Sequence, residues 1–183
     1  LYTNMLLNSG ATVDAAFGAR PLYEADLLVR VKSAAINNAK TPAEVLAQVD
    51  QLIPSIELPD LVVETPAKVN GAALSALNVG ARLGVRGAPL MVPQDAVGQA
   101  RVLNELRDMN VRLVDAADAP LGGGKGSDVL GHPLNAVVWL AQALKAEGLS
   151  LRPGQVVSLG SFSALLPPKA GQKVTAHYDG VTG

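Results

Sequence analysis

Cysteine is absent from the 183-residue chain, and histidine occurs only twice. The first absence excludes disulfides, thiolate catalysis and cysteine-ligated zinc or iron–sulfur sites. With only His132 and His177, one chain cannot supply three imidazole ligands to a catalytic zinc ion. These absences direct any metal site toward oxygen ligands and therefore toward hard cations.

Charge of one sign is not in excess either. Lys plus Arg number 15 against 16 Asp plus Glu, which gives a net charge of -1. This balance argues against a nucleic-acid-binding surface, which would need clustered basic residues. Hydrophobic residues make up 49% and charged residues 17%, as in folded rather than disordered chains. Aromatic residues contribute only 3%, so aliphatic side chains must build the core.

Long hydrophobic runs are also missing. Charged or polar side chains such as Glu24, Arg30 and Gln142 interrupt the apolar stretches before any reaches the length of a membrane span. The start of the chain shows no signal-peptide pattern. We therefore predict a cytoplasmic protein without a membrane partner. The length fits one domain, and residues 1–183 are interpreted as a single catalytic-type domain.

The hydrophobic pattern predicts a strand-rich α+β domain. Residues 22–32 are a strand candidate. The Thr-Pro-Ala-Glu run at 41–44 is typical of a helix start, and we expect this helix to continue to Ile53 and stop at Pro54. Further strands are expected at 55–63, 88–92, 111–114, 155–159 and 173–178, and a long helix at 133–147. Trp139, in the middle of that helix, is predicted to lie in the core.

Two segments remain undecided between helix and strand. Residues 95–109 fit either a surface helix or a hairpin, and the small residues at 69–84 fit either a helix or a strand pair. The glycine-rich run at 121–126 fails the phosphate-loop pattern, because Lys125 is followed by Gly126 rather than Ser or Thr. We predict a flexible turn there.

Three carboxylates are the best candidates for chemistry. Glu24 and Asp26 lie two residues apart on a predicted strand, so both side chains project from the same face. Carboxylates this close repel each other, and a nearby cation would keep both ionised. Glu57, on the next strand, is the best third member, and such a set favours Mg²⁺ or Mn²⁺. The spacing alone also fits a strand whose carboxylates simply face water.

Two polar residues have open roles. His132 stands just before Pro133 at a helix start, where exposed N–H groups favour the neutral imidazole. It would either bond to a substrate or satisfy a loop carbonyl. Asn78 lies among apolar and small residues, so it is either satisfied in the core or points into a pocket.

The run GKGSDVLGHPLNAVVWLAQAL, from Gly124 to Leu144, resembles a segment of the 2-keto-4-pentenoate hydratase and 4-oxalocrotonate decarboxylase group of the fumarylacetoacetate hydrolase superfamily. The resemblance extends backward through residues 1–31, where Glu24-Ala-Asp26 falls on the family's acid-x-acid metal motif. In IELPD, Glu57 falls on the third metal-binding carboxylate. The resemblance also extends to the end of the chain and is most specific at LGHPLNA.

The resemblance implies a mixed β-roll with flanking helices and a divalent cation, Mg²⁺ or Mn²⁺, held by Glu24, Asp26 and Glu57. The implied substrate is a short 2-oxo or 2-hydroxydienoate acid. In hydratases of this type the metal chelates the carboxylate and 2-oxygen of the substrate before water is added. Related decarboxylases use the same chelate as an electron sink.

The resemblance also assigns Asn78, His132 and Gly160 to the substrate, but the chain departs from the family pattern nearby. An Asp-Asn-Ala-Ser-like run is replaced by LNVG at 77–80, which keeps Asn78 and loses the acid and hydroxyl. The usual Leu-Thr-Gly becomes SLG at 158–160, so Leu replaces a substrate-facing Thr. Asp26 stands where Glu is common. Family members carry an N-terminal helical region with an active-site Lys, which we expect to be absent here, so no catalytic residue is assigned.

The leading hypothesis is a metal-dependent hydratase of a 2-hydroxy-2,4-dienoate in the breakdown of aromatic compounds. A 4-oxalocrotonate-type decarboxylase is the first alternative. A catalytically impaired domain that binds metal and acid, or that partners an active paralogous hydratase or decarboxylase, is the second. A mean hydropathy of +0.25 with so few charges also predicts a homo-oligomer.

Overall fold

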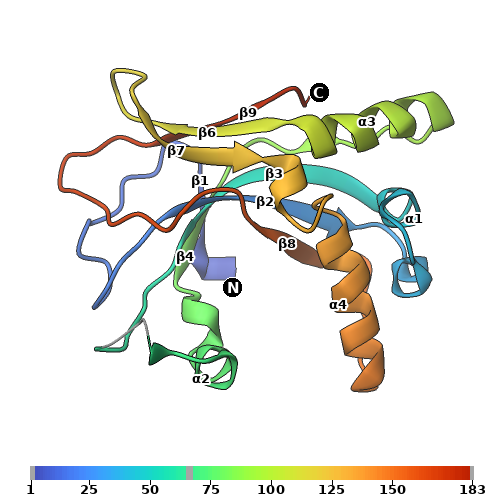
Figure 1. Cartoon of the computed structure of the whole chain (residues 1–183), viewed down its shortest axis with the longest axis horizontal. Coiled ribbons are helices and arrows are strands. Elements are labelled where there is room, and N and C mark those ends of the chain that lie inside the picture. Colours follow the sequence, from blue (N-terminus) through green and yellow to red (C-terminus); the bar gives the residue numbers. More distant parts are fainter. Residues whose placement is uncertain (1–2, 65–67, 182–183) are drawn as a thin grey trace.

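The fold is described by a computed structural model covering residues 3–64 and 68–181 (Figure 1). The strands are β1 (Leu6–Asn8), β2 (Glu24–Val31), β3 (Val49–Leu58), β4 (Leu83–Arg86), β5 (Leu90–Met91), β6 (Asn110–Val114), β7 (Pro120–Lys125), β8 (Val156–Ser161) and β9 (Thr175–Asp179). The α-helices are α1 (Pro42–Leu46), α2 (Gly71–Ala76), α3 (Ala96–Asp108) and α4 (Asn135–Ala146). The short 3-10 helices are η1 (Thr3–Met5), η2 (Ala34–Asn38), η4 (Asn78–Gly80) and η5 (Gly126–Asp128).

These strands form two sheets. The larger has the order β1-β4-β3-β2-β8, with β5 also paired to β3, and the smaller has the order β7-β6-β9. Most neighbours are antiparallel, whereas β1 and β4 are parallel. The mixed α+β fold predicted from the sequence is confirmed. Within the part of the chain that the structure describes, no helix is both long and apolar enough to cross a membrane.

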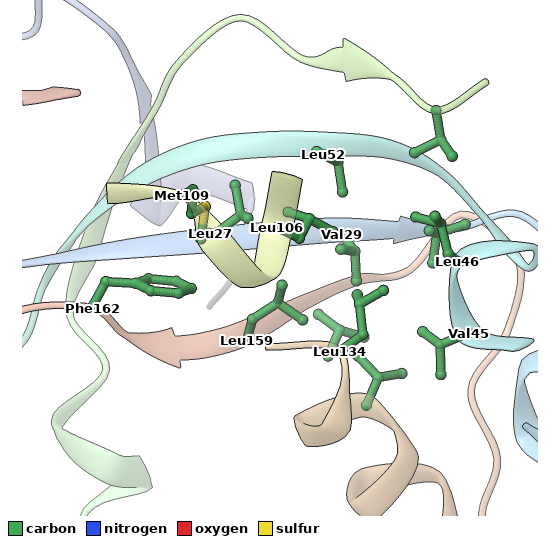
Figure 2. Close-up of a cluster of buried hydrophobic side chains, with 14 of the residues drawn as sticks. Leu27, Val29, Val45, Leu46, Leu52, Leu106, Met109, Leu134, Leu159 and Phe162 are labelled. Atoms are coloured by element: carbon green, nitrogen blue, oxygen red, sulfur yellow. The ribbon is translucent and has the colours of Figure 1, made fainter. Parts of the chain in front are cut away.

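One face of the larger sheet packs against the main hydrophobic core. Ala25, Leu27 and Val29 alternate along β2 and are almost completely buried, so they share this inner face. Figure 2 shows the buried side chains that surround them from other elements, which include Leu106, Met109, Leu134, Leu159 and Phe162. The opposite face of the sheet, which carries Glu24 and Asp26, is called the outer face below.

The helix that starts at Pro42 is shorter than predicted. The Thr41 hydroxyl caps it by accepting a hydrogen bond from the Glu44 N–H at 3.2 Å. The expected continuation to Ile53 is wrong, because α1 ends at Leu46 and β3 follows immediately. Since β3 pairs with β2 along most of its length, sheet hydrogen bonds and burial outweigh the helical spacing of its apolar residues.

Pro54 therefore lies inside β3 instead of ending a helix. Its missing N–H falls at a break in the neighbouring strands, because β4 ends opposite Ser55 and β5 begins opposite Leu52. In this gap the Gly87 N–H donates to the Pro54 carbonyl at 2.8 Å. A proline is tolerated here because no strand hydrogen bond requires its N–H.

The glycine-rich run forms β7, so the predicted flexible turn is wrong. This strand pairs antiparallel with β6. A Cβ on Gly123 would lie 2.1 Å from the Val111 carbonyl oxygen, and one on Gly126, just after β7, would lie 1.8 Å from that of Leu106. The lack of side chains lets this segment pack directly against β6 and α3.

The undecided segments are now assigned. Residues 95–109 form α3, not a hairpin, and residues 69–84 divide between α2, η4 and the start of β4. The long helix predicted at 133–147 is confirmed as α4. Trp139 on this helix is 67% exposed, so its predicted core position is wrong. The helical period places Val137 in the buried stripe and turns the side chain two residues later outward.

Candidate metal and substrate site

The pairing of β2 with β3 brings the three predicted metal ligands together on the outer face. Glu24 lies directly opposite Glu57. Asp26 follows two residues later on β2 and shares their face. Side chains directly opposite in an antiparallel pair have Cβ atoms about 5 Å apart. The topology thus unites the residues that the sequence singled out, and their role as ligands stays a prediction.

Asp26 is the most buried of the three, with 2% of its surface exposed. The Ser158 hydroxyl donates to its Oδ2 at 2.7 Å, and the Leu27 N–H donates to its Oδ1 at 2.6 Å. Burial raises the pKa of Asp26 to about 7, with the Ser158 bond opposing the rise. The negative charges of Glu57 and Glu24 raise this pKa further. The site therefore resists a third negative charge.

The two glutamates show the same trend. Burial raises the pKa of Glu24, although the Ser161 side chain acts in the opposite direction. Burial, followed by the charge of Glu24, raises the pKa of Glu57. Carboxylates that disfavour one another's ionisation are stabilised in the charged form by a shared cation.

The carboxylates of Glu24, Asp26 and Glu57 are not arranged around one position in this structure. Among residues 3–64 and 68–181, no group of three or more His, Cys, Asp or Glu side chains is arranged to hold a metal ion. Both Asp26 oxygens are instead engaged by Ser158 and Leu27. The donor set and strand register suit a hard divalent cation, and ligation by all three requires the Asp26 carboxylate to turn from these partners.

Strand β8 places two serine hydroxyls beside the carboxylates. The Ser158 hydroxyl donates to Asp26, whereas the Ser161 hydroxyl, on the residue opposite Asp26, donates to the Ser163 carbonyl at 2.6 Å. Residues three apart on a regular strand face opposite sides, but the β2–β8 pairing contains a bulge that brings both serines to the same side. Sequence reasoning missed both residues because the bulge leaves no clear signal in the alternation.

Gly160, a predicted substrate residue, lies within this irregular part of β8. Its φ of +97° is in the region that favours glycine, and its N–H donates to the Ser158 hydroxyl at 3.1 Å. A Cβ at this position would meet nothing within 4 Å, so β8 leaves open space here. The adjacent Leu159 is 1% exposed and packs in the core. Leu159, which stands where the family has a substrate-facing Thr, therefore points into the core.

Asn78 is exposed on a left-handed turn near the Glu57 end of β3. Asn78, Val79 and Gly80 have φ values of 54°, 56° and 72°. The Gly80 carbonyl accepts a hydrogen bond from the Asp60 N–H at 2.8 Å, which ties the turn to the segment just after β3. For a β-branched residue such as Val79 this conformation costs about 1–2 kcal/mol, and strain of this kind clusters at functional sites.

His132 lies apart from the other predicted residues. Its Nε2 contacts the Leu103 carbonyl at 3.1 Å, and its Nδ1 accepts a hydrogen bond from the Leu134 N–H at 3.2 Å. Burial is the main cause that lowers its pKa. The two ring nitrogens thus link α3 to the start of α4 through hydrogen bonds. Neither of these bonds involves β2 or β3.

A hollow of about 980 Å³ lies on the other side of the sheet from the carboxylates. It is lined by Ile56, which pairs with Ala25 and shares the inner face, together with Val174 and Tyr178. None of the six predicted site residues is among its lining residues. The carboxylates therefore belong to the outer face and not to this hollow.

Comparison with known proteins shows which enzymes this chain is similar to. No model of a known protein family matches the sequence. A 4-oxalocrotonate decarboxylase of Pseudomonas putida is 27% identical over 172 residues, covering 94% of this chain and 61% of that protein. A 2-keto-4-pentenoate hydratase of Paraburkholderia xenovorans is 25% identical over 185 residues, covering 99% of this chain and 64% of that protein.

A solved structure is similar over almost the whole chain. It is a 4-oxalocrotonate decarboxylase from Pseudomonas putida G7 complexed with magnesium and adipate. The TM-score is 0.80 at 24% identity, covering 97% of this chain and 64% of that chain. The curated relatives and this solved structure support the fumarylacetoacetate hydrolase superfamily for this chain.

Within that superfamily, its relatives are the 2-keto-4-pentenoate hydratases and 4-oxalocrotonate decarboxylases, as the sequence resemblance predicted. The chain spans slightly more than three fifths of the length of the two curated relatives described above.

Proposed function

We propose that this chain forms the metal-binding part of a lyase that hydrates a 2-hydroxy-2,4-dienoate of the 2-keto-4-pentenoate type. The observation that carries the proposal is the grouping of Glu24, Asp26 and Glu57 on one sheet face. The hydratases and decarboxylases among the relatives support the reaction class, and the magnesium in a similar solved structure supports a divalent cation.

In this proposal the three carboxylates hold Mg²⁺ or Mn²⁺. The bound cation would polarise the carboxylate and 2-oxygen of the acid and stabilise enolate-like charge. Asn78, exposed on its turn, is the proposed hydrogen-bond donor to the substrate. Gly160 is proposed to leave the space that the substrate occupies beside Ser158. His132 is assigned a structural role because both ring nitrogens are engaged.

Decarboxylation of a 4-oxalocrotonate-type acid is the alternative reaction, since it uses the same metal chemistry. Assays of the purified chain with Mg²⁺ separate the two by loss of the dienol absorbance or by release of carbon dioxide. Hydration that is abolished by Glu57→Gln and retained by Glu64→Gln, at an exposed position, is the expected result. Activity on neither substrate would refute both reactions.

A second candidate function is a domain that binds metal and acid without turnover, alone or as the partner of an active paralogue. The engagement of Asp26 by Ser158 and Leu27 favours it, because this arrangement holds one ligand away from the others. Turnover that appears only when a paralogous hydratase or decarboxylase is added would support this candidate. Turnover by the chain alone would exclude it.

We also propose that the chain forms a homo-oligomer. The support is a set of large apolar side chains that are more than half exposed, which are Val62, Val79, Met91, Val97, Leu130, Trp139 and Leu149. Exposed apolar surface of this kind is commonly covered by association. Sedimentation velocity over a range of concentrations tests the proposal, and a monomer at every concentration would contradict it.

A further inference from the structure

Tyr178 of β9 contacts the backbone of both strands that carry the carboxylates. Its hydroxyl bonds to the carbonyl oxygens of Asp26 and Ser55, the latter at 2.8 Å. The Ser55 N–H in turn donates to the Tyr178 hydroxyl at 3.3 Å. Asp26 and Ser55 lie opposite each other in the β2–β3 pairing, so a single side chain bridges the two strands.

This bridge lies behind the carboxylates of the outer face. The pair formed by Asp26 and Ser55 lies two residues along from the pair formed by Glu24 and Glu57. Tyr178 lines the hollow shared with Ile56 on the inner face, so it approaches the strands from behind the carboxylates. The smaller sheet thereby supports the strands beneath all three predicted ligands.

We propose that Tyr178 is a positioning residue for the metal site, whose hydroxyl sets how β2 and β3 lie beneath Glu24, Asp26 and Glu57. The inference rests on the proposed metal site. Metal–ligand distances tolerate deviations of only about 0.2 Å. A small change in the relative position of the two strands therefore weakens binding without unfolding the sheet.

Tyr178→Phe tests the role because it removes the hydroxyl and keeps the ring. Tyr23→Phe is the matched control, since Tyr23 is 3% exposed and its hydroxyl accepts a hydrogen bond from the Gln172 side chain at 3.4 Å. Among the residues that the structure describes, this hydroxyl has no hydrogen bond to strand backbone. Titration of Mn²⁺ followed by electron paramagnetic resonance gives the affinity and the spectrum of the bound ion. Thermal unfolding of the metal-free proteins measures their stability.

We expect Tyr178→Phe to bind Mn²⁺ about three- to tenfold more weakly, because the hydrogen bonds of the hydroxyl to both strands are lost, with an altered spectrum of the bound ion. Tyr23→Phe should bind as the wild type does. Equal affinity in Tyr178→Phe and wild type would overturn the proposal, and so would equal losses in both variants, which would indicate general destabilisation.

Two further outcomes do not depend on the variant folding. If the wild-type chain binds no Mn²⁺, both the metal site and the positioning role of Tyr178 are refuted. If only the positioning role is wrong, the wild type still binds Mn²⁺. The second outcome comes from amide hydrogen exchange of the metal-free wild type. The Ser55 N–H, which donates to Tyr178, should be protected, and its rapid exchange would overturn the proposed bridge.

Discussion

Asp26 should make the metal-free protein less stable as the pH rises from acidic to neutral. Its pKa is 3.8 in the unfolded chain and about 7 in the folded protein. As the pH rises, the unfolded state therefore loses its proton first. The contribution of protonated Asp26 is fully present below about pH 4 and is lost as the pH rises to about 7.

The size of this effect follows from the pKa difference. About three pKa units correspond to about 4 kcal/mol over the whole range. Between pH 5 and pH 7.5 the same linkage gives a loss of about 2.5 kcal/mol. Burial is the main cause of the shift, so Asp26→Asn, which is neutral at every pH, removes this part of the dependence. In this variant the raised pKa values of Glu24 and Glu57 should still make the free energy of unfolding fall with rising pH, but less steeply.

Urea unfolding of wild type and Asp26→Asn at both pH values, with a chelator to exclude metal, measures the effect. The free energy of unfolding of the wild type should fall by about 2–3 kcal/mol more than that of the variant. Parallel pH profiles for the two proteins would contradict this prediction, because they would mean that Asp26 has the same pKa in the folded and unfolded states.

The remaining predictions concern packing and exposure. Gly126→Ala should destabilise the protein by about 2 kcal/mol or more, because its Cβ would lie 1.8 Å from the Leu106 carbonyl oxygen. Gly71→Ala, where nothing lies within 4 Å, should unfold at the wild-type urea concentration or above it. Iodide should quench the fluorescence of Trp139 efficiently at low protein concentration, since the side chain is 67% exposed. Protection at all concentrations would contradict that exposure.

Much of the fold could be predicted from local pattern. The buried stripe of α4 and the strand of β2 have periodicities that tertiary packing reinforces, so both were predicted correctly. The errors at Ile53 and at the glycine-rich run have a common cause. Long-range pairing decides each segment, since β3 pairs with β2 and β7 pairs with β6. A pattern read over a few residues does not contain those partners.

The candidate site divides in the same way. Glu24 and Asp26 share a face by strand alternation alone, and the placement of Glu57 opposite Glu24 agrees with the family resemblance. The serines of β8 required knowledge of a bulge. Tyr178 was not predictable, because its hydroxyl reaches Asp26 from a different sheet more than a hundred residues along the chain.

Titration calorimetry of Mg²⁺ and Mn²⁺ into the metal-free protein, with and without oxalate as a chelating substrate mimic, is the most direct test of metal binding by Glu24, Asp26 and Glu57. We predict binding that oxalate tightens, that Glu24→Ala abolishes, and that Glu64→Ala, at an exposed position outside the site, retains. No binding in the wild type, or unchanged binding in Glu24→Ala, would mean that the fold is present without the proposed metal chemistry on its outer face.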